Sequence, residues 1–244
     1  MLEKKKSPKV LILVGGIGER LKPITYKIPK PMFRINGKPF LELKINYLKK
    51  FGLKDIILCV GHLSEVIENY FGNGEKFGIK INYSYEKELL GTGGAIKNAE
   101  KFIEEEFIVM NGDTHILINF SDLIHFHKNQ ENPFTMVVST ASNPNEQELV
   151  ELNNNIISRI YKRNTEDHKI YLKNNKNPLI NAGVYIFKKS ILNEIPNGKV
   201  SLEHEIFPKL IGKMSGFFYE GYHRDLTTIE DCKKIEEEFK NESI

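Results

Sequence analysis

The sequence predicts an α/β fold in which a mixed, mostly parallel sheet carries helices on both faces. Short apolar runs rich in β-branched residues alternate with segments of helical spacing, which is the pattern of a sheet with helical crossovers. A chain of 244 residues, 40% of them hydrophobic, suits one large domain with a modest second part. The first apolar run, at 10–14, breaks into a glycine-rich loop. In open α/β sheets, ligands bind beyond the carboxyl ends of the strands, so this loop is the first candidate site.

The first half of the chain alternates regularly between the two element types. We predict strands at 10–14, 55–60, 80–84 and 107–110, and helices at 39–51, 63–71, 95–103 and 121–128. The first helix illustrates the reasoning, because Leu41, Ile45 and Leu48 recur at helical spacing. Pro39 is tolerated in a first turn, and Gly52 is a stop signal.

The regular alternation of strands and helices ends near residue 133, and predicted strands become more frequent after it. We predict strands at 134–139 and 179–187, a hairpin of 149–152 with 156–161, a helix from 200–203 to 211, and a last helix at 229–239. Ser201 is the expected N-cap of the helix before 211. We therefore expect a flexible tail at 1–8 and a single domain at 9–244, divided into a first half (9–130) and a smaller, β-rich half (131–244).

Composition excludes several classes of protein. The chain has 35 Lys and Arg against 32 Asp and Glu, and a net charge of +3 is too small to indicate nucleic-acid binding. Cys59 and Cys232 lie far apart, which favours a reduced, cytoplasmic protein over a disulfide scaffold. No apolar run approaches the length of about 18 residues that a membrane span needs, and the basic start lacks the apolar stretch of a signal peptide. We therefore expect neither nucleic acid nor a membrane among its partners.

The loop after the first strand has the composition of an anion site. Residues 15–18 contain three glycines, which let the backbone approach a ligand with its N–H groups turned toward an anion. Arg20 and Lys30 can add positive charge around the same point. The third glycine of a dinucleotide fingerprint is missing, no Walker-type string occurs, and the prolines that follow prevent a regular helix. We predict a triphosphate-binding loop, with an ordinary strand-to-loop turn as the alternative.

The same stretch carries a family resemblance. Gly-Gly-x-Gly-x-Arg-Leu at 15–21, followed by Pro-Lys-Pro-Met at 29–32, resembles the signature of the sugar-1-phosphate nucleotidylyltransferases. The resemblance covers nearly the whole chain and implies a Rossmann-like fold of the nucleotide-diphospho-sugar transferase type. It also implies the Mg²⁺-dependent transfer of a nucleotidyl group from an NTP to a sugar 1-phosphate, with release of pyrophosphate. Glu19 stands where the family usually has threonine.

Within this family the chain is most similar to the compact bacterial guanylyltransferases for manno-heptose or mannose 1-phosphate. The partners we expect are thus an NTP, with GTP favoured, and one of these sugar 1-phosphates; a homodimer stays an open alternative. Two other functions also stay open. The chain could be a uridylyl- or thymidylyltransferase for another hexose or amino-sugar 1-phosphate, or a non-catalytic paralogue that binds a nucleotide sugar.

The resemblance assigns the nucleotide to the first half of the chain. Its base would meet Glu86 and the Gly-Thr-Gly-Gly-Ala turn at 91–95. A carboxylate only accepts hydrogen bonds, and guanine offers two adjacent N–H groups where uracil and thymine offer one, so Glu86 favours guanine. The alternative is that Glu86 is a solvated charge at a strand end. The nucleotide-binding residues expected on this basis are Val14, Gly15, Gly16, Gly18, Glu19, Arg20, Lys30, Glu86, Gly91, Thr92 and Gly112.

Catalysis would rest on charge placement, because a sugar phosphate with a second pKa of about 6 is mostly dianionic at neutral pH and needs no general base. The resemblance makes Arg20, Lys30 and Asp113 the catalytic residues. It also places Mg²⁺ between Asp113, which follows a buried strand, and Asp225, and carboxylates are suitable ligands for this ion.

The second half would hold the sugar phosphate. The resemblance assigns this role to Asn181, Gly183 and Glu203, and we expect Arg163 to replace the lysine that the family uses to grip the phosphate. Gln147-Glu148 and Lys162 also depart from the family pattern. These departures fall where the sugar would be recognised, so they leave its identity open.

Overall fold

The computed structural model describes residues 7–241, with the side chains up to residue 238. One sheet of nine strands runs through the molecule in the order β5-β4-β1-β6-β11-β8-β12-β10-β9. In chain order, these strands are β1 (Lys9–Leu13), β4 (Asp55–Val60), β5 (Lys80–Tyr85), β6 (Glu106–Asn111), β8 (Phe134–Thr140), β9 (Leu149–Asn153), β10 (Ile156–Tyr161), β11 (Leu179–Lys188) and β12 (Met214–Tyr219). The predicted mixed sheet is confirmed. Its parallel pairs are β5–β4, β4–β1, β1–β6 and β8–β12, and the remaining neighbours are antiparallel.

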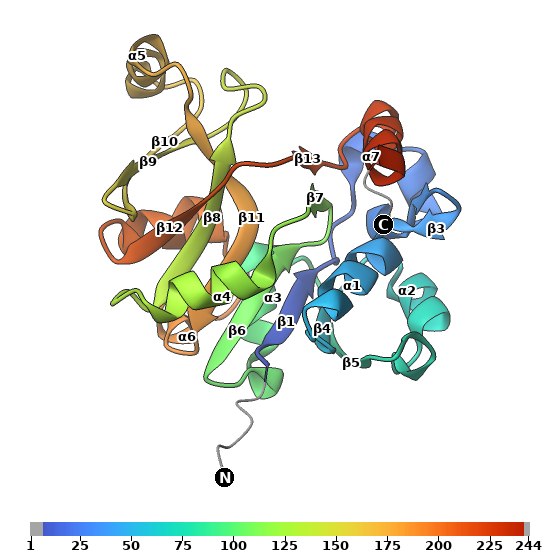
Figure 1. Ribbon diagram of the computed structural model, residues 1–244. Coiled ribbons are helices and arrows are strands. Elements are labelled where there is room, and N and C mark those ends of the chain that lie inside the picture. Colours follow the sequence, from blue (N-terminus) through green and yellow to red (C-terminus); the bar gives the residue numbers. More distant parts are fainter. Residues whose placement is uncertain (1–6, 242–244) are drawn as a thin grey trace.

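Helices cover both faces of this sheet, as the alternation of side chains along β1 requires (Figure 1). Val10 and Ile12 point into one core, with α1 (Phe40–Lys50), α2 (Ser64–Phe71) and α4 (Phe120–Lys128). Leu11 points into the other core, with α3 (Gly91–Asn98) and α6 (Ile191–Glu194). The remaining helices are α5 (Glu166–Asn174) and α7 (Ile229–Asn241), with short turns η1 (Glu19–Leu21), η2 (Ile24–Tyr26), η3 (Lys30–Met32), η4 (Glu75–Phe77), η5 (Glu100–Phe102), η6 (Leu202–Ile206) and η7 (Phe207–Leu210).

Two predicted helices differ from the structure. Helix α3 begins at Gly91 rather than at 95, so its glycines lie inside the helix. A Cβ on Gly94 would lie 2.2 Å from the carbonyl oxygen of Gly198, so the helix can approach that segment only without side chains. The segment after Ser201 forms the π turn η6 and the 3₁₀ turn η7 instead of one α-helix. Ser201 still caps it, because its Oγ accepts a hydrogen bond from the His204 N–H at 3.2 Å.

Among the elements longer than four residues, the predictions missed α5 and β12. Helix α5 projects with β9 and β10 from one end of the molecule (Figure 1), and only His168 of its residues is buried, so the sequence carries no apolar stripe there. The hairpin of β9 and β10 is confirmed. Asn154 and Asn155 form its turn with φ of 49° and 62°, values that asparagine tolerates well.

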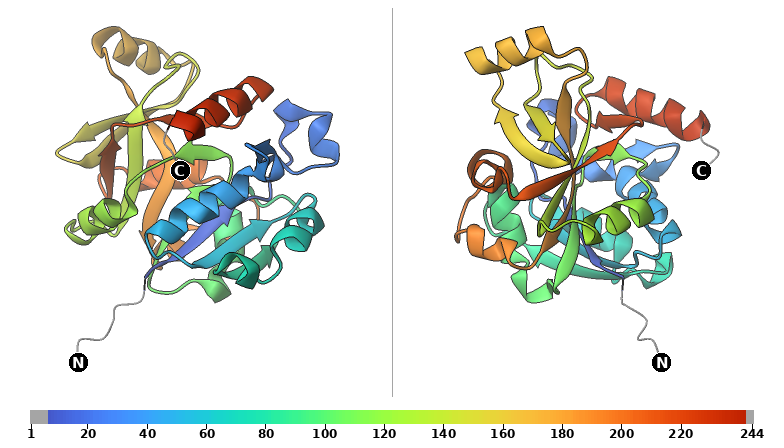
Figure 2. Two further views of the ribbon diagram at one scale, coloured as in Figure 1. Left: turned by 45° about the vertical axis from the view of Figure 1, so that its right-hand side comes forward. Right: turned by 60° about the vertical axis from the view of Figure 1, so that its left-hand side comes forward.

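The end of the chain returns to the first half. Strand β13 (His223–Asp225) pairs with β7 (Thr114–Ile116), and α7 packs beside the small hairpin of β2 (Arg34–Ile35) and β3 (Lys38–Pro39) (Figures 1 and 2). The two halves thus share one sheet and exchange segments. The division at 130 stays a prediction, and most of the predicted tail, 1–6, lies outside the described residues. Within residues 7–241, no helix has the length and apolar character needed to cross a bilayer.

Candidate active site

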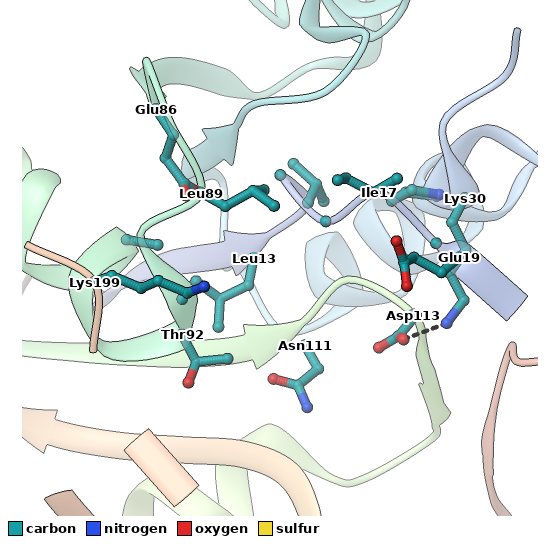
Figure 3. A pocket seen from close by; sticks show the side chains of 17 residues that line it. Leu13, Ile17, Glu19, Lys30, Glu86, Leu89, Thr92, Asn111, Asp113 and Lys199 are labelled. Atoms are coloured by element: carbon teal, nitrogen blue, oxygen red, sulfur yellow. Dashed lines mark hydrogen bonds and ion pairs between the residues drawn. The ribbon is translucent and has the colours of Figure 1, made fainter. Parts of the chain in front are cut away.

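A cavity of about 510 Å³ opens beyond the carboxyl ends of β1 and β6 (Figure 3). The glycine loop lines the middle of this cavity, and polar side chains lie at its two ends. Its lining residues are Leu13, Val14, Gly15, Gly16, Ile17, Gly18, Glu19, Lys30, Pro31, Glu86, Leu89, Gly91, Thr92, Ala95, Asn111, Asp113 and Lys199. The parallel strands place the loop and Asp113 together because their carboxyl ends meet at one edge of the sheet.

Glycine occupies the positions of this loop for different structural reasons. A Cβ on Gly15 would lie 2.7 Å from Oε1 of Glu86. In the neighbouring turn after β6, a Cβ on Gly112 would lie 2.4 Å from the Leu13 carbonyl oxygen. Gly18 has φ of +67°, which disfavours any other residue. A Cβ on Gly16 would meet nothing within 4 Å, so packing does not explain this exposed glycine. Its backbone is open to a ligand.

Glu86 forms one end of the cavity. Its Oε2 accepts a hydrogen bond from the Leu90 N–H at 3.0 Å, while its Oε1 lies over Gly15. Burial raises the pKa of Glu86, and the Leu90 N–H opposes that rise. A half-buried carboxylate with one oxygen directed at the loop is suited to accept hydrogen bonds from a ligand. The alternative of a solvated charge does not describe this position.

Charged groups gather at the other end. The ammonium of Lys30 lies 2.5 Å from Oδ2 of Asp113 (Figure 3). A smaller hollow of about 320 Å³ adjoins them, and it is lined by Gly18, Glu19, Arg20, Leu21, Lys30, Asn111, Asp113, Asp225 and Thr227. Arg20 is exposed and lines this hollow but not the large cavity.

Asp225 reaches the hollow through β13. Its Oδ1 accepts a hydrogen bond from Oγ1 of Thr114 at 2.6 Å, across the β7–β13 pair. Desolvation by the surrounding residues and the neighbouring Asp113 charge raise the pKa of Asp225, although its side chain is 47% exposed toward the hollow. Two carboxylates that repel each other in one hollow are a site that a cation would stabilise.

Comparison with known proteins identifies the family. The family model described as nucleotidyl transferase matches residues 9–240. This chain belongs to that family. A D-glycero-alpha-D-manno-heptose 1-phosphate guanylyltransferase of Campylobacter jejuni is 42% identical over 231 residues, which are 91% of this chain and 95% of that protein. A mannose-1-phosphate guanyltransferase of Gibberella zeae is 36% identical over 232 residues, or 91% of this chain and 62% of that protein.

A solved structure agrees with these relatives. The crystal structure of HddC from Yersinia pseudotuberculosis, complexed with GMP-PN, is 31% identical and has a TM-score of 0.80. The match covers 96% of this chain and all (100%) of that one. The predicted nucleotide-diphospho-sugar transferase type of fold is therefore confirmed, and so is the class of enzyme.

The residues of this nucleotidyl transferase suit a hard divalent cation. Asp113 and Asp225 offer carboxylate oxygens, and Oδ1 of the neighbouring Asn111 is buried without a hydrogen-bond partner among the described residues. Across the described part of the chain, no three His, Cys, Asp or Glu side chains form a metal cluster. Two carboxylates are nevertheless enough for Mg²⁺, which commonly takes one or two of them and completes its shell with water and substrate phosphates.

The first turn of α3 is tied to the segment at 200–203. Oε2 of Glu203 accepts hydrogen bonds from Oγ1 of Thr92 at 2.7 Å and from Oγ of Ser201 at 2.9 Å. A Cβ on Gly91 would lie 2.6 Å from the Val200 carbonyl oxygen, and Gly91 has φ of +71°. Two residues assigned to different substrates, Thr92 and Glu203, therefore belong to one hydrogen-bonded unit.

Asn181 and Gly183 lie at the start of β11, beside Asn111. The side chain of Asn181 bonds within its own strand, to the Gly183 N–H at 3.0 Å and to the Tyr185 hydroxyl at 2.7 Å. A Cβ on Gly183 would lie 2.7 Å from Nδ2 of Asn111, and Gly183 has φ of +67°. The glycine gives the Asn111 side chain its room, and Asn181 fixes the local backbone.

The structure does not bring Arg163 to either cavity. Arg163 is exposed, and its guanidinium lies 3.4 Å from the Glu146 carbonyl oxygen, near α5. The expectation that Arg163 grips a phosphate is therefore not supported by its position. Lys199 enters the large cavity from the second half instead, near Thr92 (Figure 3). No sequence signal marks Lys199, because an exposed lysine after Pro-Asn-Gly resembles many other surface lysines.

Proposed function

We propose that this enzyme transfers a guanylyl group from GTP to a sugar 1-phosphate and releases pyrophosphate. The observation that carries the proposal is a single cavity with the Glu86 carboxylate at one end and the Lys30–Asp113 pair at the other. The exposed backbone of the glycine loop lies between them. In this arrangement the first half holds the nucleotide, and the second half contributes the sugar side.

Glu86 would select the base. Its carboxylate can accept the two adjacent N–H groups of guanine, whereas the single N–H of uracil or thymine lies between two carbonyl oxygens that a carboxylate repels. An unpaired buried polar group costs about 1–3 kcal/mol, which is enough for roughly tenfold discrimination or more. The guanylyltransferases among the relatives agree with this preference.

The chemistry is a displacement at the α-phosphorus by an oxygen of the sugar phosphate. That group is mostly dianionic at neutral pH, so the chain needs no general base, and its task is to align two anions that repel each other. Lys30, at the acidic end of the cavity, would contact the reacting phosphate, and Arg20, in the adjoining hollow, would stabilise the departing pyrophosphate. Lys199, rather than Arg163, would supply the cation from the sugar side.

Asp113 and Asp225 would hold the Mg²⁺ that we propose for this site. When bound, the ion would neutralise charge on the phosphate that is being transferred. Lys30 would keep Asp113 oriented through their ion pair, and Thr114 would do the same for Asp225 through its hydrogen bond.

The identity of the sugar is proposed from the similar proteins and from the positions where this sequence departs from the family pattern. Manno-heptose 1-phosphate ranks first and mannose 1-phosphate second, because a guanylyltransferase for each is similar to this chain. Glu148 lies 3.7 Å from His204, beside the Thr92–Glu203 unit, where the family pattern is altered. This is the region in which a different sugar would be accommodated.

A two-way panel tests the proposal. Pyrophosphate release is measured for GTP, UTP, dTTP, CTP and ATP, each against manno-heptose, mannose, glucose and N-acetylglucosamine 1-phosphates. GTP with a manno-configured sugar is expected to give the highest kcat/KM. Preference for UTP or dTTP would overturn the base assignment, turnover only with gluco-configured sugars would overturn the sugar, and no release in any pair would favour the non-catalytic paralogue.

A further inference from the structure

Lys44 is a buried lysine that none of the roles above uses. It lies on α1 and is only 8% exposed. Its ammonium donates hydrogen bonds to the carbonyl oxygens of Asn111, at 3.1 Å, and Thr114, at 2.5 Å. Burying a cation is costly unless it is compensated, so two main-chain acceptors mark a defined place for this side chain.

The two carbonyl groups bracket the turn that carries Asp113. The Gly112 N–H donates to the Leu13 carbonyl oxygen at 2.9 Å, and the Leu226 N–H donates to the Asp113 carbonyl oxygen at 2.7 Å. These bonds tie the turn to β1 and to the segment after β13. Lys44 adds a third attachment, from α1.

Lys44 also lies behind the site rather than in it. It lines neither the large cavity nor the hollow with Asp225. Its second acceptor, Thr114, is the residue whose hydroxyl donates to Asp225. One ammonium thus holds the backbone next to both carboxylates without facing a substrate.

We propose that Lys44 is a positioning residue, which fixes the turn at 111–114 so that the Asp113 carboxylate keeps its direction toward Lys30 and its spacing from Asp225. This inference rests on the proposed function, in which Asp113 and Asp225 hold the metal ion. An error of about 1 Å in such a group can reduce turnover about 100-fold, so a side chain that never touches substrate can still control the rate.

If Lys44 acts through its attachment to the turn, its loss weakens metal binding, and if it acts through its charge alone, its loss strengthens metal binding. A nearby cation repels a divalent ion, so the loss of the Lys44 charge alone would tighten metal binding. The loss of the attachment would let the two carboxylates separate and would weaken it. An ion bound in the hollow therefore reports which role Lys44 has.

The experiment compares Lys44→Met, Lys44→Gln and Lys49→Met with the wild-type enzyme. Lys49 is the matched control, because it lies on the same helix and its ammonium donates to the Phe77 carbonyl oxygen at 2.5 Å, away from both cavities. Gln at position 44 keeps a donor without the charge and serves if the Met variant does not fold. Mn²⁺ replaces Mg²⁺ because both ions suit oxygen ligands, and its binding is followed by electron paramagnetic resonance. Steady-state kcat and KM for GTP are measured in parallel.

We expect Lys44→Met to bind Mn²⁺ at least about fivefold more weakly and to lose about 10- to 100-fold in kcat, with KM for GTP nearly unchanged. Lys44→Gln should fall between Met and wild type, and Lys49→Met should match wild type in both quantities. Tighter or unchanged Mn²⁺ binding in the Lys44 variants, or equal effects of the two Met variants, would overturn the proposal. If the wild-type enzyme binds no Mn²⁺, the proposed metal site is wrong, and the kcat comparison alone decides the role of Lys44.

Discussion

Lys30 connects the glycine loop to the acidic end of the cavity, and its role can be tested by truncation. Its side chain is 14% exposed, and its ammonium forms an ion pair with Asp113. Because the ammonium would act on charge that develops during transfer, Lys30→Ala should lower kcat about 100- to 1000-fold. Pyrophosphate release gives kcat, and calorimetry should show a melting temperature within a few degrees of wild type.

Lys27 provides the control for Lys30. It is exposed in the same segment and lines neither cavity, so Lys27→Ala should keep the wild-type rate. Near-normal turnover in Lys30→Ala, or an equal loss in both variants, would remove Lys30 from the mechanism.

The base preference should depend on one oxygen of Glu86. Glu86→Gln keeps the shape and an acceptor but places N–H donors where guanine also donates. The ratio of kcat/KM for GTP over UTP should therefore fall about tenfold or more. Glu88, two residues on and exposed, is the control, since Glu88→Gln should leave that ratio unchanged. An unaltered ratio in Glu86→Gln would mean that the base is recognised elsewhere.

At the scale of elements, the first turn of α7 determines where Asp225 sits. The Asp231 carboxylate accepts hydrogen bonds from the N–H and hydroxyl groups of Thr227 and Thr228 at 2.8–3.1 Å, and from Arg224 at 3.0 Å. These donors flank Asp225 on both sides along the chain. The helix cap thus also anchors the strand end that contributes the second acid of the hollow.

This cap gives a prediction for stability against pH. Burial alone raises the pKa of Asp231, but the hydrogen bonds from Thr227, Thr228 and Arg224 outweigh it and lower the pKa to about 2 from an ordinary value of 3.8. The ionised form is therefore favoured in the folded state. Its contribution of roughly 2 kcal/mol is present above pH 4 and is lost as the pH falls toward 2.

Urea unfolding of Asp231→Asn measures this contribution. The variant should be about 2 kcal/mol less stable than wild type at pH 6, and the difference should shrink to about half near pH 3. Glu230→Gln is the control, because Glu230 is exposed on the same turn and pairs only with Lys234 among the described residues. A difference that does not change with pH would show that the charge of Asp231 is not what stabilises the cap.

At the scale of the whole molecule, the acidic hollow depends on two segments 112 residues apart in sequence. Asp113 follows β6, and Asp225 ends β13, which reaches the site by pairing with β7. The acidic hollow of the candidate site is therefore complete only when β13 has paired with β7. Neither half alone contains both carboxylates.

The Mg²⁺ concentration that the enzyme requires should depend on both carboxylates of the hollow. Asp113→Asn and Asp225→Asn should each raise the Mg²⁺ concentration for half-maximal activity at least about tenfold, because each removes a charged ligand. Asp122→Asn, an exposed position on α4, should not change it. Activity is titrated with MgCl₂ after dialysis against EDTA, and full activity in EDTA would contradict a metal at this site.

Local sequence was sufficient to predict most elements of the first half. Strand β4 follows from a short apolar run that is buried on both faces of the sheet, and helix α1 follows from apolar residues at helical spacing. Segments whose conformation depends on contacts with distant parts of the chain were missed or assigned wrongly. Helix α5 has no apolar stripe, and the glycines of α3 lie inside a helix because the 198–200 segment packs against them.

The sequence alone placed the glycine loop and Asp113 after buried strands, and parallel strands bring their carboxyl ends to a common edge. The family resemblance then assigned Lys30, Glu86 and Asp113 to the same substrates. What the tertiary structure decided is which distant side chains join them. Lys199 enters the cavity and Arg163 does not, and Lys44 supports the Asp113 turn from behind. A sequence pattern reports the periodicity of one element. The direction of a charged side chain between two elements depends on how they pack, and only the folded chain specifies that.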